Sequence, residues 1–245
     1  MPLNNFHQTQ AFSKDGDHFI SDINYWELKA EKLTLVKCEF FIEHYKAQLY
    51  AEYGIALPST IENAVDKRQA EFLAGRFVAQ LALLKLGFSQ NSLPNIGFDK
   101  NRCPVWPKGY VGSIAHSSTS AICVLSNNKS HLGLDIEDVL SPDSASQISY
   151  IVHNDVELNL LSAGCSCEAE ATTIIFSAKE SLFKALYPKL KVYFDFDSAR
   201  VVSVDRYNST LKLKLLDDFV RMHGIPQYYY CRYTILDEVV ITLID

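Results

Sequence analysis

The sequence predicts an α+β fold, because two long helical segments stand among runs of short strands. The first helix is expected over Ser59–Leu86, opening with capping-box spacing and stopped by Gly87. The second is expected over Glu168–Tyr187, which contains neither Gly nor Pro, and Pro188 should end it. After Pro188 the pattern is typical of strands only. The chain therefore lacks the regular alternation of strands and helices that an α/β fold would show.

Alternating or β-branched residues predict the individual strands. In chain order they are 33–40, one or two strands within 111–125 interrupted at 115–120, 133–137, 192–196, 199–204, 211–216, 228–234 and 239–244. Short helices are expected over 43–53, ending at Gly54, and from Asn154 to Leu161, where Asn154-Asp-Val-Glu157 can form a cap. Residues 1–30 show no clear period, and 141–147 form a polar connection.

The composition is that of an ordinary globular protein. Of 245 residues, 48% are hydrophobic and 21% charged, and a chain of this length can bury a core without disulfides or structural metal. A net charge of −6 argues against broad nucleic-acid binding. We find no secretion signal and no membrane-length apolar run, and the six cysteines form no C-x-x-C pair. A cytoplasmic protein with free thiols is expected.

The predicted second helix carries three charged residues within a mostly apolar sequence. Glu180 and Lys184 are four positions apart and share one face, and Lys179 lies one step round the helix. On these residues alone, a surface ion pair beside a buried apolar stripe is as good an interpretation as a functional site.

A second acidic group lies on the predicted strand Gly133-Leu-Asp-Ile-Glu137. Side chains alternate along a strand, so Asp135 and Glu137 share one face. Such a pair can converge on a hard cation, and oxygen ligands with substrate phosphates suit Mg²⁺. Glu180 would be the third carboxylate. A lone D-x-E motif usually marks a solvated strand face. Its combination with the charged residues of the second helix, about forty positions later, is a far more specific sign of a functional site.

The first half of the chain offers several groups that could bind phosphate. Arg68 and Arg76 lie two helical turns apart on roughly one side of the first helix, and guanidinium forks match phosphate oxygens. The alternative is a solvated face with Gly75 as a packing glycine. The loop over 94–107 adds two cations, Lys100 and Arg102. His116 lies where the following strand region is interrupted, and small hydroxylated residues such as Ser113 lie near it.

These segments together resemble one family. Gly133–Glu137 and Phe176–Lys184 are similar to the two signature motifs of the 4′-phosphopantetheinyl transferases. Three more segments resemble the siderophore-associated, enterobactin synthase component D type: Arg68–Arg76, Arg102–Pro107 and Gly112–His116. The likeness runs from about Pro58 to Lys191. The family often has Trp at the position of Phe176 and Ala at that of Ser181, which affects the expected pocket shape but not the reaction.

The resemblance implies a fold of two similar α+β halves related by a pseudo-twofold, with the active site in the cleft between them. A weak internal sequence similarity fits this fold, since Phe72–Gln80 aligns with Phe176–Lys184 at Phe and Ala. We place the boundary near residue 127. Residues 1–126 would hold the coenzyme A phosphate-binding groups, and residues 127–245 the Mg²⁺-binding carboxylates and the catalytic helix.

The implied reaction transfers 4′-phosphopantetheine from coenzyme A to a serine of an apo carrier protein and releases 3′,5′-ADP. The nucleophile belongs to the partner, and the enzyme is expected to act as a monomer. Asp135, Glu137 and Glu180 would hold Mg²⁺, with Glu180 as the best candidate base. Lys184 would stabilise the α-phosphate and the leaving group. The remaining phosphate contacts would come from Arg68, Arg76, Lys100 or Arg102, Ser113, His116 and, less strongly, Lys179.

Two other functions stay open on the sequence. A Mg²⁺-dependent hydrolase or kinase acting on another nucleotide lacks support, because no G-x-x-x-x-G-K-[ST] loop is present. A non-catalytic module that binds coenzyme A or a carrier protein would show no metal-dependent turnover. The carrier itself is open among acyl, peptidyl and aryl types, and the siderophore-type resemblance favours a nonribosomal peptide synthetase.

Overall fold

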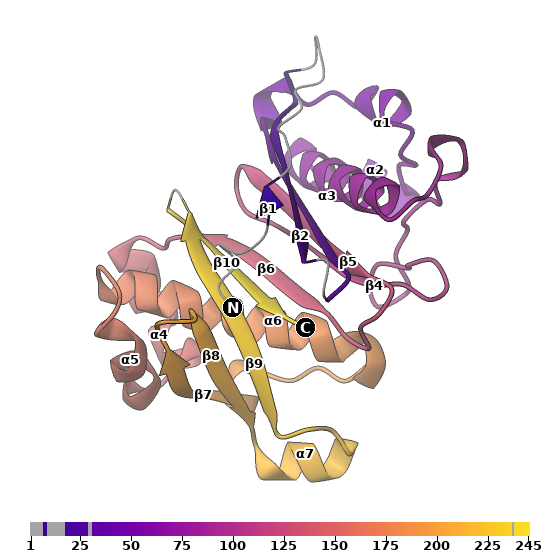
Figure 1. The fold of residues 1–245 in the computed structure, drawn as a ribbon. Helices are drawn as coiled ribbons and strands as arrows, with labels where there is room; N and C mark the ends of the chain where they lie inside the picture. The colour runs from indigo at the N-terminus through magenta and orange to yellow at the C-terminus, as the bar shows by residue number, and fades with distance from the viewer. Residues whose placement is uncertain (1–6, 9–17, 29–30, 237) are drawn as a thin grey trace. The chain divides into compact units, whose positions relative to one another are not determined.

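The computed structural model describes residues 7–8, 18–28, 31–236 and 238–245. They fall into two compact units, within Phe6–Ser130 and His131–Asp245 (Figure 1). Each unit contains an antiparallel sheet packed against helices, which confirms the expected α+β fold of two halves. The expected pseudo-twofold, the cleft and the assignment of function to 1–126 and 127–245 stay predictions.

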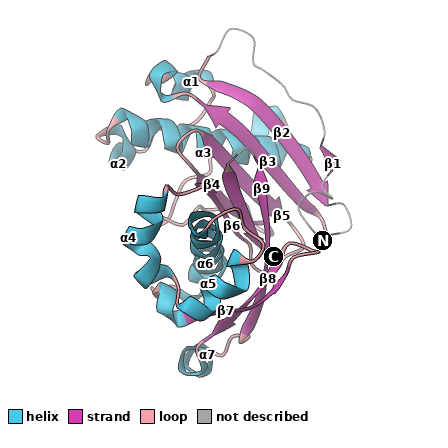
Figure 2. Cartoon of the chain, turned by 90° about the vertical axis from the view of Figure 1, so that its left-hand side faces the viewer, coloured by secondary structure: helices cyan, strands magenta, loops and turns pink. Residues whose placement is uncertain are grey.

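The N-terminal unit is a sheet with one long helix on it (Figure 2). Its strands, in spatial order, are β1 (His7–Gln8), β2 (Ile20–Leu28), β3 (Leu33–Phe40), β5 (Ser120–Ser126) and β4 (Val111–His116). The helix α3 (Asp66–Lys85) packs on β3 and β5, and the short helices α1 (Leu49–Glu52) and α2 (Ser59–Glu62) precede it. Strand β2 lies in the region where the sequence showed no period.

The expected helix over Ser59–Leu86 is broken. α2 ends at Glu62 and α3 begins at Asp66, with Val65 in an extended conformation between them. The side-chain nitrogen Nε2 of Gln69 donates to the backbone carbonyl oxygens of Glu62 and Ala64, at 3.0 and 2.8 Å. One buried side chain therefore satisfies the backbone acceptors that the break exposes, which makes the interruption stable.

The C-terminal unit repeats the plan with more helices. Its sheet has the order β6 (Gly133–Asp138), β10 (Val239–Ile244), β9 (Tyr228–Leu236), β8 (Thr210–Leu215) and β7 (Ala199–Asp205). The long helix α6 (Glu168–Leu190) packs on β6 and β10, while α4 (Pro142–Val152) and α5 (Asp155–Ser162) pack against α6. A further helix, α7 (Asp217–His223), joins β8 to β9.

Three expectations for this unit are wrong. Residues 141–147 are not a polar connection, because Ser141 caps α4 by accepting from the Ser144 amide at 3.2 Å. α6 continues through Pro188 and ends where Lys191 adopts a left-handed φ of 55°. Residues 192–196 form no strand, although their alternation suggested one; they are a loop leading into a 3-10 turn.

The contact between β6 and α6 is close enough to require a glycine. A Cβ atom on Gly133 would lie 1.8 Å from the carbonyl oxygen of Ser181 and 2.7 Å from the amide nitrogen of Ala185. Both atoms belong to the backbone of α6 and cannot swing away. Gly133 therefore allows the strand and the helix that carry the two motifs to lie in direct backbone contact.

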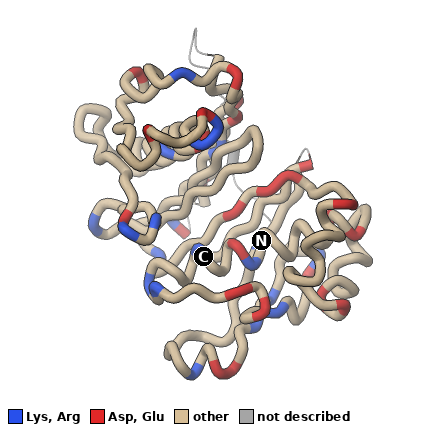
Figure 3. The backbone as a smooth tube through the Cα atoms, turned by 180° about the vertical axis from the view of Figure 1, so that it is seen from behind, with Lys and Arg blue, Asp and Glu red and all other residues tan. Residues whose placement is uncertain are grey.

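In the part of the chain that the structure describes, no helix has both the length and the apolar character needed to cross a bilayer. Acidic and basic residues are interspersed along both units (Figure 3). All six cysteines lie in the described part and are free thiols.

Candidate functional site

The two motifs of the C-terminal unit are joined by an ion pair. Nζ of Lys184 on α6 donates to Oδ1 of Asp135 on β6 at 2.6 Å. The carboxylate is buried, whereas 29% of the Lys184 side chain is exposed. Oδ2 of Asp135 is also buried and has no hydrogen-bond partner among the described residues. Lys184 thus fixes one carboxylate oxygen and leaves the other as an unused acceptor.

The other two carboxylates are electrostatically linked to this pair. Burial, together with the nearby charges of Asp135 and Glu180, raises the pKa of Glu137 to about 8, against the opposing effect of Lys184. Burial also raises the pKa of Glu180, against the effect of Lys184. Three acidic side chains therefore share a largely buried region with Lys184, and the raised pKa values of Glu137 and Glu180 reflect burial and mutual repulsion.

These residues fit a magnesium ion chemically but do not form a ready-made site. Among the described residues, no group of three or more His, Cys, Asp and Glu side chains could hold a metal ion as they stand. The assignment of Asp135, Glu137 and Glu180 as magnesium ligands stays a prediction; in this structure Oδ1 of Asp135 accepts from Lys184. The unused Oδ2 of Asp135, with oxygen ligands nearby, still suits a hard cation.

Lys179 is placed differently from the sequence expectation. Its side chain is 2% exposed, and Nζ lies 2.8 Å from Oε1 of Glu157 and 2.7 Å from the carbonyl oxygen of Val152. Burial lowers the pKa of the ammonium group, against the attraction of Glu157. With its donors committed inside the unit, Lys179 is no longer a candidate for phosphate binding.

A cavity of about 260 Å³ lies beside Glu180 within the C-terminal unit. One wall is α6, where Phe183 lines it, and the opposite wall is the loop after that helix. The loop contributes three aromatic rings in sequence, Tyr193, Phe194 and Phe196. Phe176 packs against Phe196 with the two rings tilted and their centroids 5.4 Å apart. An apolar chain could therefore lie next to the Glu180 carboxylate.

In the N-terminal unit the structure brings Arg68 and His116 together. Nη1 of Arg68 lies 3.1 Å from Nε2 of His116 and 3.2 Å from Oε2 of Glu71. Nε2 of His116 also lies 3.6 Å from Oε2 of Glu71, so the three side chains form one polar group. Glu71 is a member of this group that sequence reasoning missed, although its position three residues after Arg68 on a helix was a usable signal.

Arg76 is mostly committed to the structure of its own unit. Its Nε donates to the carbonyl oxygen of Ile96 at 2.6 Å, and its guanidinium lies 4.2 Å from the centre of the Phe72 ring. Burial lowers its pKa to about 10. Gly75, next to it, would bring a Cβ to 3.0 Å from Ile114 on β4, so this glycine permits close packing. Arg76 holds the 94–107 loop in place.

That loop presents the two remaining cations at the surface. Lys100 and Arg102 are exposed, and Arg102 has a left-handed φ of 64°. Asp99 shapes the turn, since its Oδ1 accepts from the amides of Asn101 and Cys103 at 2.8 and 3.0 Å. Ser113 is buried on β4. A role for these residues in binding coenzyme A stays a prediction.

Comparison with known families covers both units. Residues 57–126 match the model of the 4′-phosphopantetheinyl transferase N-terminal domain, and residues 131–243 match that of the 4′-phosphopantetheinyl transferase superfamily. The chain belongs to the 4′-phosphopantetheinyl transferase superfamily. The matches include β6 and α6, so the acid pair and the Glu180 helix lie in the part of the chain that this family defines.

Individual relatives agree with this assignment. Enterobactin synthase component D of Escherichia coli K12 is 30% identical over 205 residues, 83% of this chain and 90% of that protein. The protein of the same name from Salmonella typhi is 36% identical over 162 residues, 66% of this chain and 65% of that protein. 4′-Phosphopantetheinyl transferase Svp of Streptomyces mobaraensis is 32% identical over 160 residues, 64% of this chain and 63% of that protein. This match to the Salmonella typhi protein spans slightly less than two thirds of that protein.

Proposed function

We propose that this protein transfers the 4′-phosphopantetheine group of coenzyme A to a serine of an apo carrier protein. The observation that carries the proposal is the Lys184–Asp135 pair, which joins the family's two motifs and leaves a buried carboxylate oxygen unused beside two further acids. In the reaction, the serine oxygen forms a bond to the β-phosphorus while the pyrophosphate P–O bond breaks. 3′,5′-ADP leaves.

The residues of the C-terminal unit have distinct parts in this proposal. Oδ2 of Asp135, with Glu137 and Glu180, would hold Mg²⁺, which when bound neutralises pyrophosphate charge. The raised pKa of Glu180 suits a group that accepts the serine proton directly or through a water. Lys184 supplies a positive charge for the leaving phosphate. The cavity beside Glu180 would receive the pantetheine arm, whose dimethyl segment suits its aromatic walls.

The N-terminal unit would bind the other phosphates of coenzyme A. Arg68 and His116 already lie together, and a guanidinium beside an imidazole offers several donors to one phosphate. Lys100 and Arg102 are exposed and able to reach a ligand. Arg76 would act mainly by holding their loop through Ile96.

The carrier is inferred from the relatives. Several of them are named enterobactin synthase component D, which supports a peptidyl or aryl carrier domain of a nonribosomal peptide synthetase in siderophore biosynthesis. We further infer that the protein works as a monomer in the cytoplasm; its six free thiols suit a reducing compartment.

The test is mass spectrometry of an apo carrier protein incubated with the enzyme, coenzyme A and Mg²⁺. The carrier should gain one phosphopantetheine, and the gain should disappear with EDTA or in Glu180→Gln. Glu168→Gln, which changes an exposed acid on the same helix, should transfer normally. Coenzyme A binding without transfer to peptidyl, aryl or acyl carriers would instead identify a non-catalytic binding module.

A further inference from the structure

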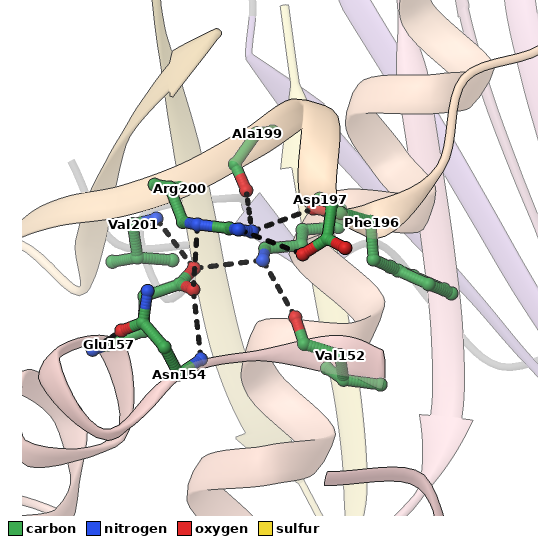
Figure 4. A network of polar contacts seen from close by, with 9 residues as sticks. Val152, Asn154, Glu157, Phe196, Asp197, Ala199, Arg200 and Val201 are labelled. Atoms are coloured by element: carbon green, nitrogen blue, oxygen red, sulfur yellow. Dashed lines mark hydrogen bonds and ion pairs between the residues drawn. The ribbon is translucent and has the colours of Figure 1, made fainter. Parts of the chain in front are cut away.

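A buried carboxylate lies at the centre of a polar network in the C-terminal unit (Figure 4). The Glu157 side chain is 1% exposed. Its Oε1 accepts from the amide of Val201 at 2.9 Å, and its Oε2 accepts from the amide of Asn154 at 3.2 Å. Glu157 therefore does more than close the capping box of α5, because it also binds the backbone of β7.

Two cations approach this carboxylate from different elements. Lys179 of α6 contacts Oε1 of Glu157 and also the carbonyl of Val152 at the end of α4. Arg200 of β7 lies on the other side, with Nε 3.8 Å from Oε2 of Glu157. The network thus joins α4, α5, α6 and the start of β7 through one acid.

Arg200 extends the network into the loop that walls the cavity. Its Nη2 donates to Oδ1 of Asp197 at 2.8 Å, and its Nη1 donates to the carbonyl oxygens of Phe196 and Ala199 at 3.4 and 3.3 Å (Figure 4). Phe196 and Ala199 both line the cavity beside Glu180. Lys179 lines the same cavity from α6.

A contribution to folding stability does not by itself explain why these charges are buried. Desolvating a buried ion pair offsets its attraction, and apolar residues of similar volume often serve a fold equally well. What these charges provide is geometry, because Glu157 and Arg200 fix the loop at a set distance from the helix that carries Glu180. A loop held only by aromatic packing could slide and change the width of the cavity.

We propose that Glu157, Lys179 and Arg200 are positioning residues that set the width of the cavity beside Glu180 and so select the pantetheine arm of coenzyme A. The inference rests on the proposed function. It predicts an effect on ligands that carry the arm and none on ligands that lack it. 3′,5′-ADP shares the nucleotide part of coenzyme A without the arm, so the two ligands separate positioning from general damage.

The experiment compares Arg200→Gln with Arg221→Gln by calorimetric titration in the presence of Mg²⁺. Both arginines pair with an aspartate three residues earlier in the same unit, Arg200 with Asp197 and Arg221 with Asp218, but only Arg200 contacts the cavity loop. Arg200→Gln should weaken coenzyme A binding about fivefold, the scale of one lost hydrogen bond. Binding of 3′,5′-ADP should stay within about twofold, as should both ligands with Arg221→Gln.

A second variant guards against misfolding. Glu157→Gln combined with Lys179→Met removes both buried charges at similar volume and should give the same loss for coenzyme A alone. In turnover assays the KM for coenzyme A should rise while kcat at saturation changes less. Equal weakening of both ligands, or unchanged coenzyme A binding in folded variants, overturns the inference. Failure of the wild-type protein to bind coenzyme A or to modify a carrier would count against the proposed function itself.

Discussion

The ammonium group of Lys184 and the buried carboxylate of Asp135 form a 2.6 Å hydrogen bond that joins α6 to β6. The pair holds Asp135 in one orientation, with Oδ1 occupied and Oδ2 unused. A helix side chain therefore orients a strand carboxylate toward its proposed ligand, as outer-sphere partners of metal ligands commonly do.

Lys184→Met should lower the free energy of unfolding by about 2 kcal/mol without metal, because it leaves a buried carboxylate uncompensated. Mg²⁺ should restore part of this loss by binding the freed acid. Urea unfolding with and without MgCl₂ measures both effects. Lys189→Met, at an exposed position of the same helix, is the control. An identical loss in both buffers would contradict the metal assignment.

Gly133→Ala should be the most damaging small substitution in the C-terminal unit. The new Cβ would overlap the Ser181 carbonyl, so β6 and α6 would have to separate. We expect a loss of about 3 kcal/mol or more. Gly164→Ala is the matched control, since its Cβ would meet only the flexible side chain of Arg206. Thermal unfolding followed by circular dichroism compares them, and a similar melting temperature for both variants would refute the close-contact explanation.

The acid sensitivity of the C-terminal unit should depend on His153. Burial lowers the pKa of His153 below its usual 6.5, and its Nε2 lies 3.0 Å from Oγ1 of Thr172. The unfolded chain therefore binds the proton first. The stability that neutral His153 contributes is fully present above about pH 6.5 and is lost as the pH falls below it.

Between about pH 7.5 and about pH 5.5, the wild-type protein should lose a few tenths of a kcal/mol more than His153→Gln. The effect is small because the side chain is only half-buried. Urea unfolding at the two pH values gives the difference directly. Parallel pH dependence in the two proteins would show that other groups determine the acid sensitivity.

Arg68 and His116 should act as one unit in binding coenzyme A. Because they touch each other, Arg68→Gln is expected to weaken binding about tenfold, and adding His116→Gln should cost less than it does alone. Calorimetric titration of the two single variants and the double variant gives the coupling. Lys67→Gln removes the same charge from the neighbouring exposed position of α3 and should have little effect. Strictly additive losses would mean that the contact has no bearing on the ligand.

The sequence was most informative where one local rule decided the structure. Alternation placed Asp135 and Glu137 on one face of β6, and the structure has that strand over Gly133–Asp138. The cap at Asn154 and Glu157 is confirmed, with both hydrogen bonds present. These features depend on neighbours within a few residues, so they can be predicted without knowing the fold.

Other features depend on contacts between distant segments. The break before α3 is stabilised by Gln69, and the burial of Lys179 depends on Glu157, which is 22 positions earlier in the chain. Pro188 lies inside α6, which ends only two residues later at Leu190. None of these can be inferred from periodicity, although the apolar neighbours of Lys179 at Ile175 and Leu182 do indicate a buried helix face.

Gly133 determines the distance between the two signature motifs. With backbone against backbone at this point, the spacing from β6 to α6 depends on main-chain atoms whose positions do not change with side-chain rotamers. Ser181 also joins α6 to β10, the strand next to β6, because its hydroxyl donates to the carbonyl oxygen of Thr242 at 3.0 Å. Sequence drift at the surrounding core positions can therefore alter stability while Asp135 and Glu180 keep a constant separation, so the chemistry of this site can persist in relatives whose cores differ.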